Sequence, residues 1–121
     1  MKQFLIVFLG GGLGSLCRFL LSQISFFNYS KFPASTLISN IFGCFLLGMV
    51  LGYAMKNNQL NSPQTLLLST GFCGGLTTFS SFAFENINMI KSGDLNQLFF
   101  YTFLSLFLGF TAILFGLYLS K

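Results

Sequence analysis

Four long apolar segments, separated by short polar ones, dominate the pattern of this chain. No formal charge occurs in residues 32–55 or 95–120, and the segments 3–30 and 57–90 contain one charged side chain each. Every segment exceeds the roughly 20 residues that an α-helix needs to cross the hydrocarbon core of a bilayer. The pattern therefore predicts an all-α integral membrane protein with four transmembrane helices.

Polar residues and prolines at the borders of these segments indicate where the helices begin and end. Pro33 suits the first turn of the second helix, because its fixed φ is helical and its missing N–H is not needed there. Asn61 or Ser62 can cap the third helix, with Pro63 at its first position. We expect one domain, residues 1–121, and the predicted helices are 3–27, 33–55, 63–90 and 95–120.

The third segment departs from an ordinary spanning helix near its middle. Residues 71–82 there include two adjacent glycines followed by four hydroxyl side chains. Glycine weakens a helix, and serine or threonine can take over the freed backbone groups. Because lipid satisfies no backbone group, a break is tolerated only against protein, water or an ion. The pattern predicts a broken third helix whose freed carbonyls could bind a cation; a kinked but continuous helix is the alternative.

The distribution of charge narrows the class of protein further. Only 7% of the residues are charged and 54% are hydrophobic, whereas soluble domains carry roughly 25% charged residues. The net charge of +4 comes from scattered basic residues that form no patch, so we expect no nucleic-acid partner.

The lysines barely choose an orientation in the membrane. In a four-span arrangement Lys2, Lys56 and Lys121 share one side, and Lys31 and Lys91 share the other. With three lysines against two, the positive-inside rule does not predict which side faces the cytoplasm. This weak bias reflects either the small numbers in a short chain or insertion in both orientations as an antiparallel dimer.

Polar side chains form one stripe on each of three predicted helices. A carboxamide at mid-membrane must find a partner or line a polar path, and an interhelical hydrogen bond that only joins the bundle is the equal alternative. These stripes carry no formal charge except at Glu85. Their members are Thr36, Asn40 and Gly43; Thr78, Ser81 and Glu85; and Tyr101, Ser105 and Gly109.

Phe79 and Phe82 differ from the other phenylalanines because they lie within the hydroxyl-rich break. The edge of an aromatic ring is positive, so rings turned edge-on can support an anion without a full charge. A small hydrated anion also needs hydrogen-bond donors, and weak multiple sites permit flow. The donors available are Asn40, Thr78, Ser80, Ser81 and Ser105.

Two charged side chains lie within the predicted spans, and we expect structural roles for both. Arg18 can snorkel or bind backbone carbonyls, and Glu85 can pair with a backbone amide or a cation. Proton-coupled antiporters need a titratable carboxylate in the substrate path, and the first span contains no acid.

Small residues and cysteines in the spans indicate packing. Glycines recur four residues apart, which lets helices approach closely in lipid; the pairs are Gly10 with Gly14, Gly48 with Gly52, and Gly71 with Gly75. The cysteines, Cys17, Cys44 and Cys73, have no ligand spacing. We interpret them as small hydrophobic residues and expect neither a disulfide framework nor a zinc site.

Three blocks in the right order resemble the Fluc or CrcB family of small four-helix fluoride channels. They are residues 71–82 followed by Glu85, residues 40–48 preceded by Thr36, and residues 11–19. The resemblance covers nearly the whole chain. It implies an antiparallel, dual-topology homodimer with two pores, each lined by both subunits.

The resemblance also assigns roles to particular positions. Phe79 and Phe82 match the rings that line the fluoride path, and Asn40 matches the pore asparagine. Tyr101 and Ser105 match a polar track on the fourth helix. A further pair, Gly74 and Thr77, matches positions whose carbonyls hold a structural sodium ion (Na+) at the dimer axis.

Some positions depart from the family pattern. Ser15 replaces a usual alanine, Phe19 a usual tyrosine and Ser35 a usual glycine, while Ser81 stands where threonine is common. Gly109 falls where some relatives extend the track with a serine. The break, the two rings and Asn40 match the pattern.

The predicted function is therefore passive, fluoride-selective conduction that exports fluoride from the cytoplasm across a bacterial inner (plasma) membrane. No enzymatic chemistry is expected. Two alternatives belong to other classes: a small dual-topology, proton-coupled multidrug antiporter, and a non-transporting membrane assembly subunit.

Overall fold

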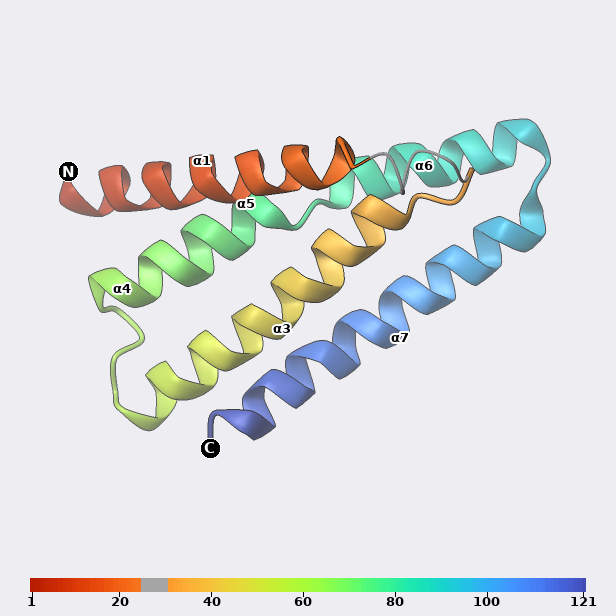
Figure 1. The fold of residues 1–121 in the computed structure, drawn as a ribbon. Helices are drawn as coiled ribbons and strands as arrows, with labels where there is room; N and C mark the ends of the chain where they lie inside the picture. Colours follow the sequence, from red (N-terminus) through yellow and green to blue (C-terminus); the bar gives the residue numbers. More distant parts are fainter. Residues whose placement is uncertain (25–30) are drawn as a thin grey trace.

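The computed structural model describes residues 1–24 and 31–121, and every regular element in them is helical. Two long helices, α3 and α7, lie side by side along their length, and α1 lies against the first half of the segment that runs from α4 to α6 (Figure 1). The elements in chain order are α1 (Lys2–Ser22), α3 (Ala34–Lys56), α4 (Pro63–Leu66), η1 (Leu67–Cys73), α5 (Gly74–Leu76), α6 (Phe79–Ser92) and α7 (Leu95–Leu119).

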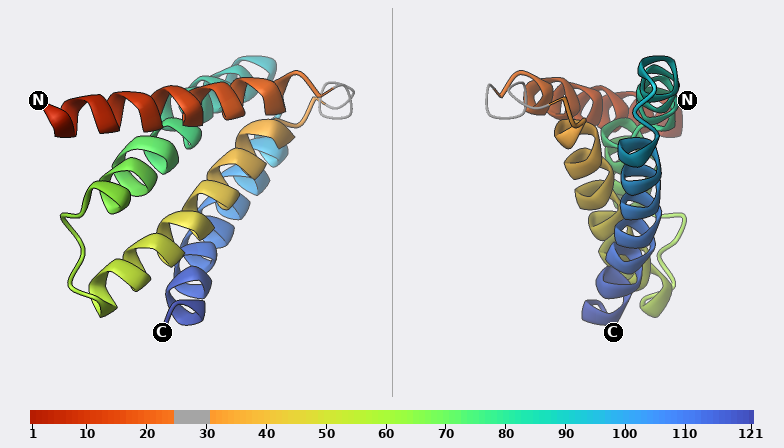
Figure 2. Two further views of the ribbon diagram at one scale, coloured as in Figure 1. Left: turned by 60° about the vertical axis from the view of Figure 1, so that its left-hand side comes forward. Right: turned by 90° about the vertical axis from the view of Figure 1, so that its right-hand side faces the viewer.

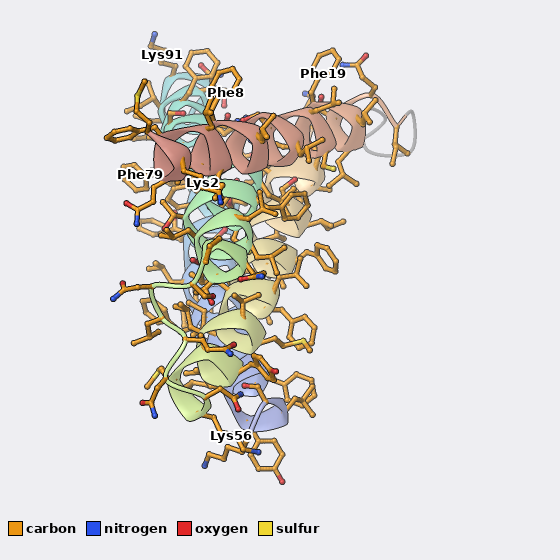
Figure 3. All side chains as sticks on the ribbon, turned by 90° about the vertical axis from the view of Figure 1, so that its left-hand side faces the viewer. Lys2, Phe8, Phe19, Lys56, Phe79 and Lys91 are labelled. Carbon is orange, nitrogen blue, oxygen red and sulfur yellow. The ribbon has the colours of Figure 1, made fainter. Side chains whose placement is uncertain are left out.

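Four helical segments in the described residues are long and apolar enough to span a membrane. They are Lys2–Ser22, Ala34–Lys56, Pro63–Ser92 and Leu95–Leu119. The all-α, four-span class predicted from the sequence is confirmed. Lys56 and Lys91 lie at opposite ends of the molecule (Figure 3), as expected for residues on opposite sides of a bilayer.

The end of α1 and the start of α3 differ from the prediction, whereas the other helix boundaries agree within two residues. Helix α1 ends at Ser22, although the apolar pattern predicted helix to residue 27; residues 25–27 lie outside the described part of the chain. Helix α3 begins at Ala34, so Pro33 is its N-cap residue and not its first helical residue. The ψ of Pro33 is 65°, and this non-helical value keeps it out of the first turn.

The third membrane span is broken, as the sequence predicted. Its first part passes from α4 into a π-helix, η1, and then into α5. Thr77 (φ −79°, ψ 153°) and Thr78 (φ −149°, ψ 120°) are extended, and α6 begins after them. Figure 1 shows this interruption as a bend between α5 and α6. The alternative of a continuous kinked helix is therefore wrong.

Helix α1 packs on the first half of the third span through bare backbone. A Cβ built on Gly71 would lie 3.0 Å from the Cα of Gly10, and a Cβ on Gly14 would lie 2.8 Å from the amide nitrogen of Leu76. Close backbone contact of this kind is how helices associate in lipid. The glycines therefore fix the position of the break relative to α1.

Helices α3 and α7 approach each other in the same way. A Cβ on Gly116 would lie 2.8 Å from the amide nitrogen of Met49, and Gly48 faces the backbone of Ile113. The two views in Figure 2 show α3 and α7 together from both directions. This closely packed pair lies against the broken helix.

The outer surface of the chain is largely apolar. Large hydrophobic side chains project outward along α1 and α7, including Phe4 and Phe8, which are 76% and 75% exposed. Figure 3 shows Phe8 and Phe19 pointing away from the helices. An apolar surface of this extent is expected against lipid or another membrane helix, since water offers it no stabilisation.

Candidate functional site

Asn40 of α3 anchors the break in the third span. Its side-chain oxygen accepts a hydrogen bond from the amide of Thr78 (2.7 Å), and its side-chain nitrogen donates to the carbonyl of Thr78 (3.2 Å). These bonds satisfy two backbone groups that the broken helix cannot satisfy itself. A carboxamide NH₂ has two donors, so one N–H of Asn40 remains available.

A cavity of about 390 Å³ lies beside this anchor, between α3, the broken span and α7. We call it the ring cavity. Its polar or aromatic lining includes five residues that the sequence predicted for an ion path: Asn40, Thr78, Phe79, Phe82 and Ser105. Its apolar side consists of Leu47, Leu106, Phe110 and Ile113. The lining includes no charged side chain, so an ion in this cavity would meet only dipoles and ring edges.

The aromatic rings at the cavity form a short chain. The centroids of Phe79 and Phe82 are 6.0 Å apart with planes inclined by 45°, and those of Phe82 and Tyr101 are 5.2 Å apart. Phe82 lies at the interior end of this pair, whereas Phe79 is 79% exposed. Figure 3 shows Phe79 at the margin of the molecule. The cavity is therefore open on the side that Phe79 borders.

The hydroxyl of Ser105 is a second free donor at this site. Its oxygen is buried, and no hydrogen bond reaches it from the described residues. Leaving a buried hydroxyl unsatisfied costs about 1–3 kcal/mol. Other cavity hydroxyls are engaged: Ser69 donates to the carbonyl of Thr65 (2.6 Å) and Thr77 to that of Cys73 (2.9 Å). Ser105 is thus poised to donate to a ligand.

Glu85 joins three helices through its carboxylate. The hydroxyl of Thr36 donates to one oxygen (2.5 Å), and the hydroxyl of Tyr101 donates to the other (2.7 Å). Both partners are therefore hydroxyl groups, and not the backbone amide or cation that the sequence predicts. Tyr101 is fully buried and its hydroxyl points to Glu85. Tyr101 and Ser105 therefore lie on one stripe but face different groups.

A second, smaller cavity of about 250 Å³ is lined by further polar residues that the sequence analysis singled out. Arg18, Thr36, Ser81 and Glu85 contribute to its lining, and Thr78 lines both cavities. We call it the carboxylate cavity. The structure therefore places Ser81 on the Glu85 side of Thr78, and not with the two rings in the ring cavity.

Arg18 binds a carbonyl that the break has freed. Its Nε donates to the carbonyl oxygen of Gly75 (3.1 Å), and the hydroxyl of Ser15 lies 3.5 Å from the same oxygen. No acidic partner of Arg18 occurs among the described residues. Of the two structural roles expected for Arg18, the structure shows the binding of a backbone carbonyl.

Two neighbouring carbonyls, those of Gly74 and Thr77, lose their helical donors at the break. In a continuous helix the amide of Thr78 would bond to the carbonyl of Gly74, but it donates to Asn40. The amide of Ser81 would bond to the carbonyl of Thr77, but it donates to the hydroxyl of Thr78 (3.2 Å). Gly74 is exposed. Both oxygens are therefore suited to bind a hard cation.

Sequence reasoning missed a polar link between α6 and α7. The side chain of Asn86 donates to the carbonyl of Phe82 (3.0 Å) and accepts from the hydroxyl of Thr102 (3.2 Å). The available signal was a carboxamide and a hydroxyl in two otherwise apolar spans. This link holds the turn that carries Phe82 against α7.

The fold and the site together define a class: a small helical membrane protein with a broken span and an uncharged cavity, as expected for an ion-conducting protein. Comparison with known proteins gives the family. The sequence profile described as "CrcB-like protein, Camphor Resistance (CrcB)" matches residues 5–117. The chain belongs to this CrcB/FluC family and is a multi-pass membrane protein.

Curated relatives match over their whole length. The chain is 47% identical to the "Fluoride-specific ion channel FluC" of Gloeothece citriformis, with 100% of this chain and 98% of the relative aligned. It is 42% identical to the protein of the same name from Flavobacterium psychrophilum and 38% to that from Azobacteroides pseudotrichonymphae, with the same coverage. Likeness at this level extends to all four spans.

Proposed function

We propose that this protein is a fluoride-selective channel that lets fluoride leave the cytoplasm passively through the bacterial plasma membrane. The observation that carries the proposal is the ring cavity. An unpartnered hydroxyl (Ser105), a carboxamide with a free N–H (Asn40) and two phenylalanine rings line one uncharged space. The names of the relatives support fluoride as the conducted ion. No enzymatic chemistry is part of the proposal.

Conduction requires that the protein replace the water around a strongly hydrated anion without holding it. Ser105 and Asn40 donate hydrogen bonds, and the ring edges of Phe79 and Phe82 supply weak positive potential. Several weak sites favour both entry and exit, whereas a fixed cation would retain the ion. Thr78, Ser81 and Tyr101 hold the surrounding backbone and carboxylate in place.

A second copy of the chain, inserted in the opposite orientation, would complete each pore. Support comes from the open side of the ring cavity, where Phe79 is 79% exposed. The extensive apolar surface and the balanced lysines fit the same arrangement. The antiparallel homodimer is therefore part of the proposal.

A structural sodium ion belongs to the proposed assembly. The carbonyls of Gly74 and Thr77 would hold it, because the break has removed their helical donors. The ion would supply positive charge that stabilises these oxygens. Hard cations of this kind bind oxygen ligands, and the described residues contain no group of three or more His, Cys, Asp or Glu side chains that could hold a metal ion instead.

Two alternatives remain distinguishable by experiment. A proton-coupled antiporter would require a mobile titratable carboxylate, but Glu85 is held by two hydroxyls. Its transport would depend on a pH gradient. A non-transporting assembly subunit would show no flux alone and would copurify with a partner.

The test is fluoride efflux from reconstituted vesicles. Purified protein is placed in liposomes loaded with fluoride, and a fluoride electrode records release once a potassium ionophore removes the membrane potential. We expect efflux well above that of protein-free vesicles, without a pH gradient, and little chloride release in parallel vesicles. Efflux equal to the protein-free control would refute the proposal.

A further inference from the structure

Two cysteines lie in the wall of the ring cavity. Cys44 is on α3 and Cys73 is the last residue of η1, and both line the same space as Asn40, Phe82 and Ser105. Cys73 is 2% exposed, and Cys44 is half-buried. Cys17, on α1, lines neither the ring cavity nor the carboxylate cavity. The chain therefore contains a pair of thiols at the proposed ion path and a third thiol away from it.

The register of α3 against the third span brings these two thiols together. Asn40 bonds to Thr78, and a Cβ on Gly43 would overlap the methyl group of Thr77. The helices run in opposite directions here, so Cys44 comes next to the turn that contains Cys73. Both residues consequently line the same cavity.

The thiol of Cys44 also faces α7. Its sulfur lies 3.8 Å from the position that a Cβ on Gly109 would take. Because Gly109 has no side chain, the sulfur occupies the space between α3 and α7 at the cavity wall. A group bound to this sulfur would therefore stand directly in the ring cavity.

The ligand chemistry of this pair is that of a soft cation. Thiolates are soft ligands that prefer soft metal ions, and two of them satisfy an ion such as mercury(II) in linear coordination. The lining of the ring cavity includes no imidazole or carboxylate that would compete with the two thiols for a soft ion. Neutral mercuric chloride can enter an uncharged, largely apolar cavity through lipid.

We infer that Cys44 and Cys73 form a two-thiol site for soft, thiophilic metal ions, and that occupation of this site blocks the ring cavity. With mercuric chloride, two S–H bonds and two Hg–Cl bonds break, two Hg–S bonds form, and two protons and two chloride ions are released. No oxidant or reductant takes part. The existence of the site is independent of the proposed function; only the block of fluoride flux rests on it.

Binding is tested first, on the detergent-purified protein with mercuric chloride as the probe. The Cys17→Ala chain should take up one mercury, measured by intact mass, and both remaining thiols should lose reactivity with a maleimide. Removing Cys44 or Cys73 as well should leave a single Hg–S bond, which glutathione reverses at a concentration about tenfold lower, since the second bond forms intramolecularly. Two mercury ions per Cys17→Ala chain, one on each thiol, would overturn the paired site.

Flux is tested second, in fluoride-loaded vesicles, with each variant normalised to its own untreated rate. Mercuric chloride should block the unmodified chain and the matched control Cys17→Ala, and it should leave the rate of the Cys44→Ala/Cys73→Ala chain unchanged. Equal block in that double variant would overturn the assignment of the block to this pair. If the untreated protein conducts no fluoride, the proposed function fails, while the mass and maleimide measurements still decide the site.

Discussion

Replacing Ser105 with alanine should affect the stability of the protein and its fluoride conduction in opposite directions. The hydroxyl of Ser105 is buried and has no partner among the described residues. An unsatisfied buried hydroxyl costs about 1–3 kcal/mol, so its removal should leave the protein as stable as before or up to that amount more stable. Few substitutions at a polar position in a membrane span would leave the stability unchanged or raise it.

The effect on conduction should be opposite. A hydrogen bond to a charged group contributes about 1.5–3 kcal/mol. If fluoride receives one such bond from Ser105 while it crosses the ring cavity, losing that bond raises the barrier by this amount, which lowers the flux roughly 10- to 150-fold. Ser105→Ala should therefore yield a well-folded protein that conducts poorly.

Ser69→Ala is the matched control for this experiment. Ser69 lines the same cavity, but its hydroxyl already donates to the carbonyl of Thr65 (2.6 Å). This variant should lose about 0.5–1.5 kcal/mol of stability and much less flux than Ser105→Ala. Thermal unfolding in detergent and fluoride-electrode efflux measure the two quantities. Early unfolding of Ser105→Ala together with unchanged flux would refute the role assigned to the hydroxyl.

Three further substitutions test the rest of the site. Phe79→Ile and Phe82→Ile should each strongly reduce efflux, because isoleucine has no positive ring edge, while each variant elutes like the unmodified protein in size-exclusion chromatography. Unchanged efflux in both variants would remove the rings from the mechanism. Asn40→Leu should destabilise the protein by about 2–6 kcal/mol, since both backbone groups of Thr78 lose their partner. If its unfolding temperature equals that of the unmodified chain, Asn40 does not hold the break in place. Gly75→Leu should separate α1 from the broken span and lower the unfolding temperature, because a Cβ there would lie 3.0 Å from the Cα of Gly11; an unfolding temperature equal to that of the unmodified chain would contradict this packing.

The four spans and the break could be predicted because they follow from local rules. Length and apolarity define a membrane helix whatever its neighbours are, and residues 71–82 combine adjacent glycines with hydroxyl side chains. The early end of α1 at Ser22 had no such signal, because the apolar pattern continues beyond it. A helix end inside an apolar stretch is decided by what packs there.

The hydrogen-bond partners could not be predicted, since they depend on how helices meet. Spacing placed Tyr101 and Ser105 on one stripe, yet the hydroxyl of Tyr101 bonds to Glu85 and that of Ser105 has no partner. Asn40 was recognised as a residue that needs a partner. That this partner would be the backbone of Thr78 required the register of α3 against the broken span.

The break also explains why the proposed conduction site carries no charge. Each backbone group that it frees needs a new partner: Asn40 takes both groups of Thr78, and Arg18 takes the carbonyl of Gly75. The positive charge of Arg18 is thereby held at the carboxylate cavity and does not line the ring cavity. In the proposed channel, an anion among the rings would therefore meet one free N–H and one free hydroxyl, both neutral, and such weak sites would let it leave again.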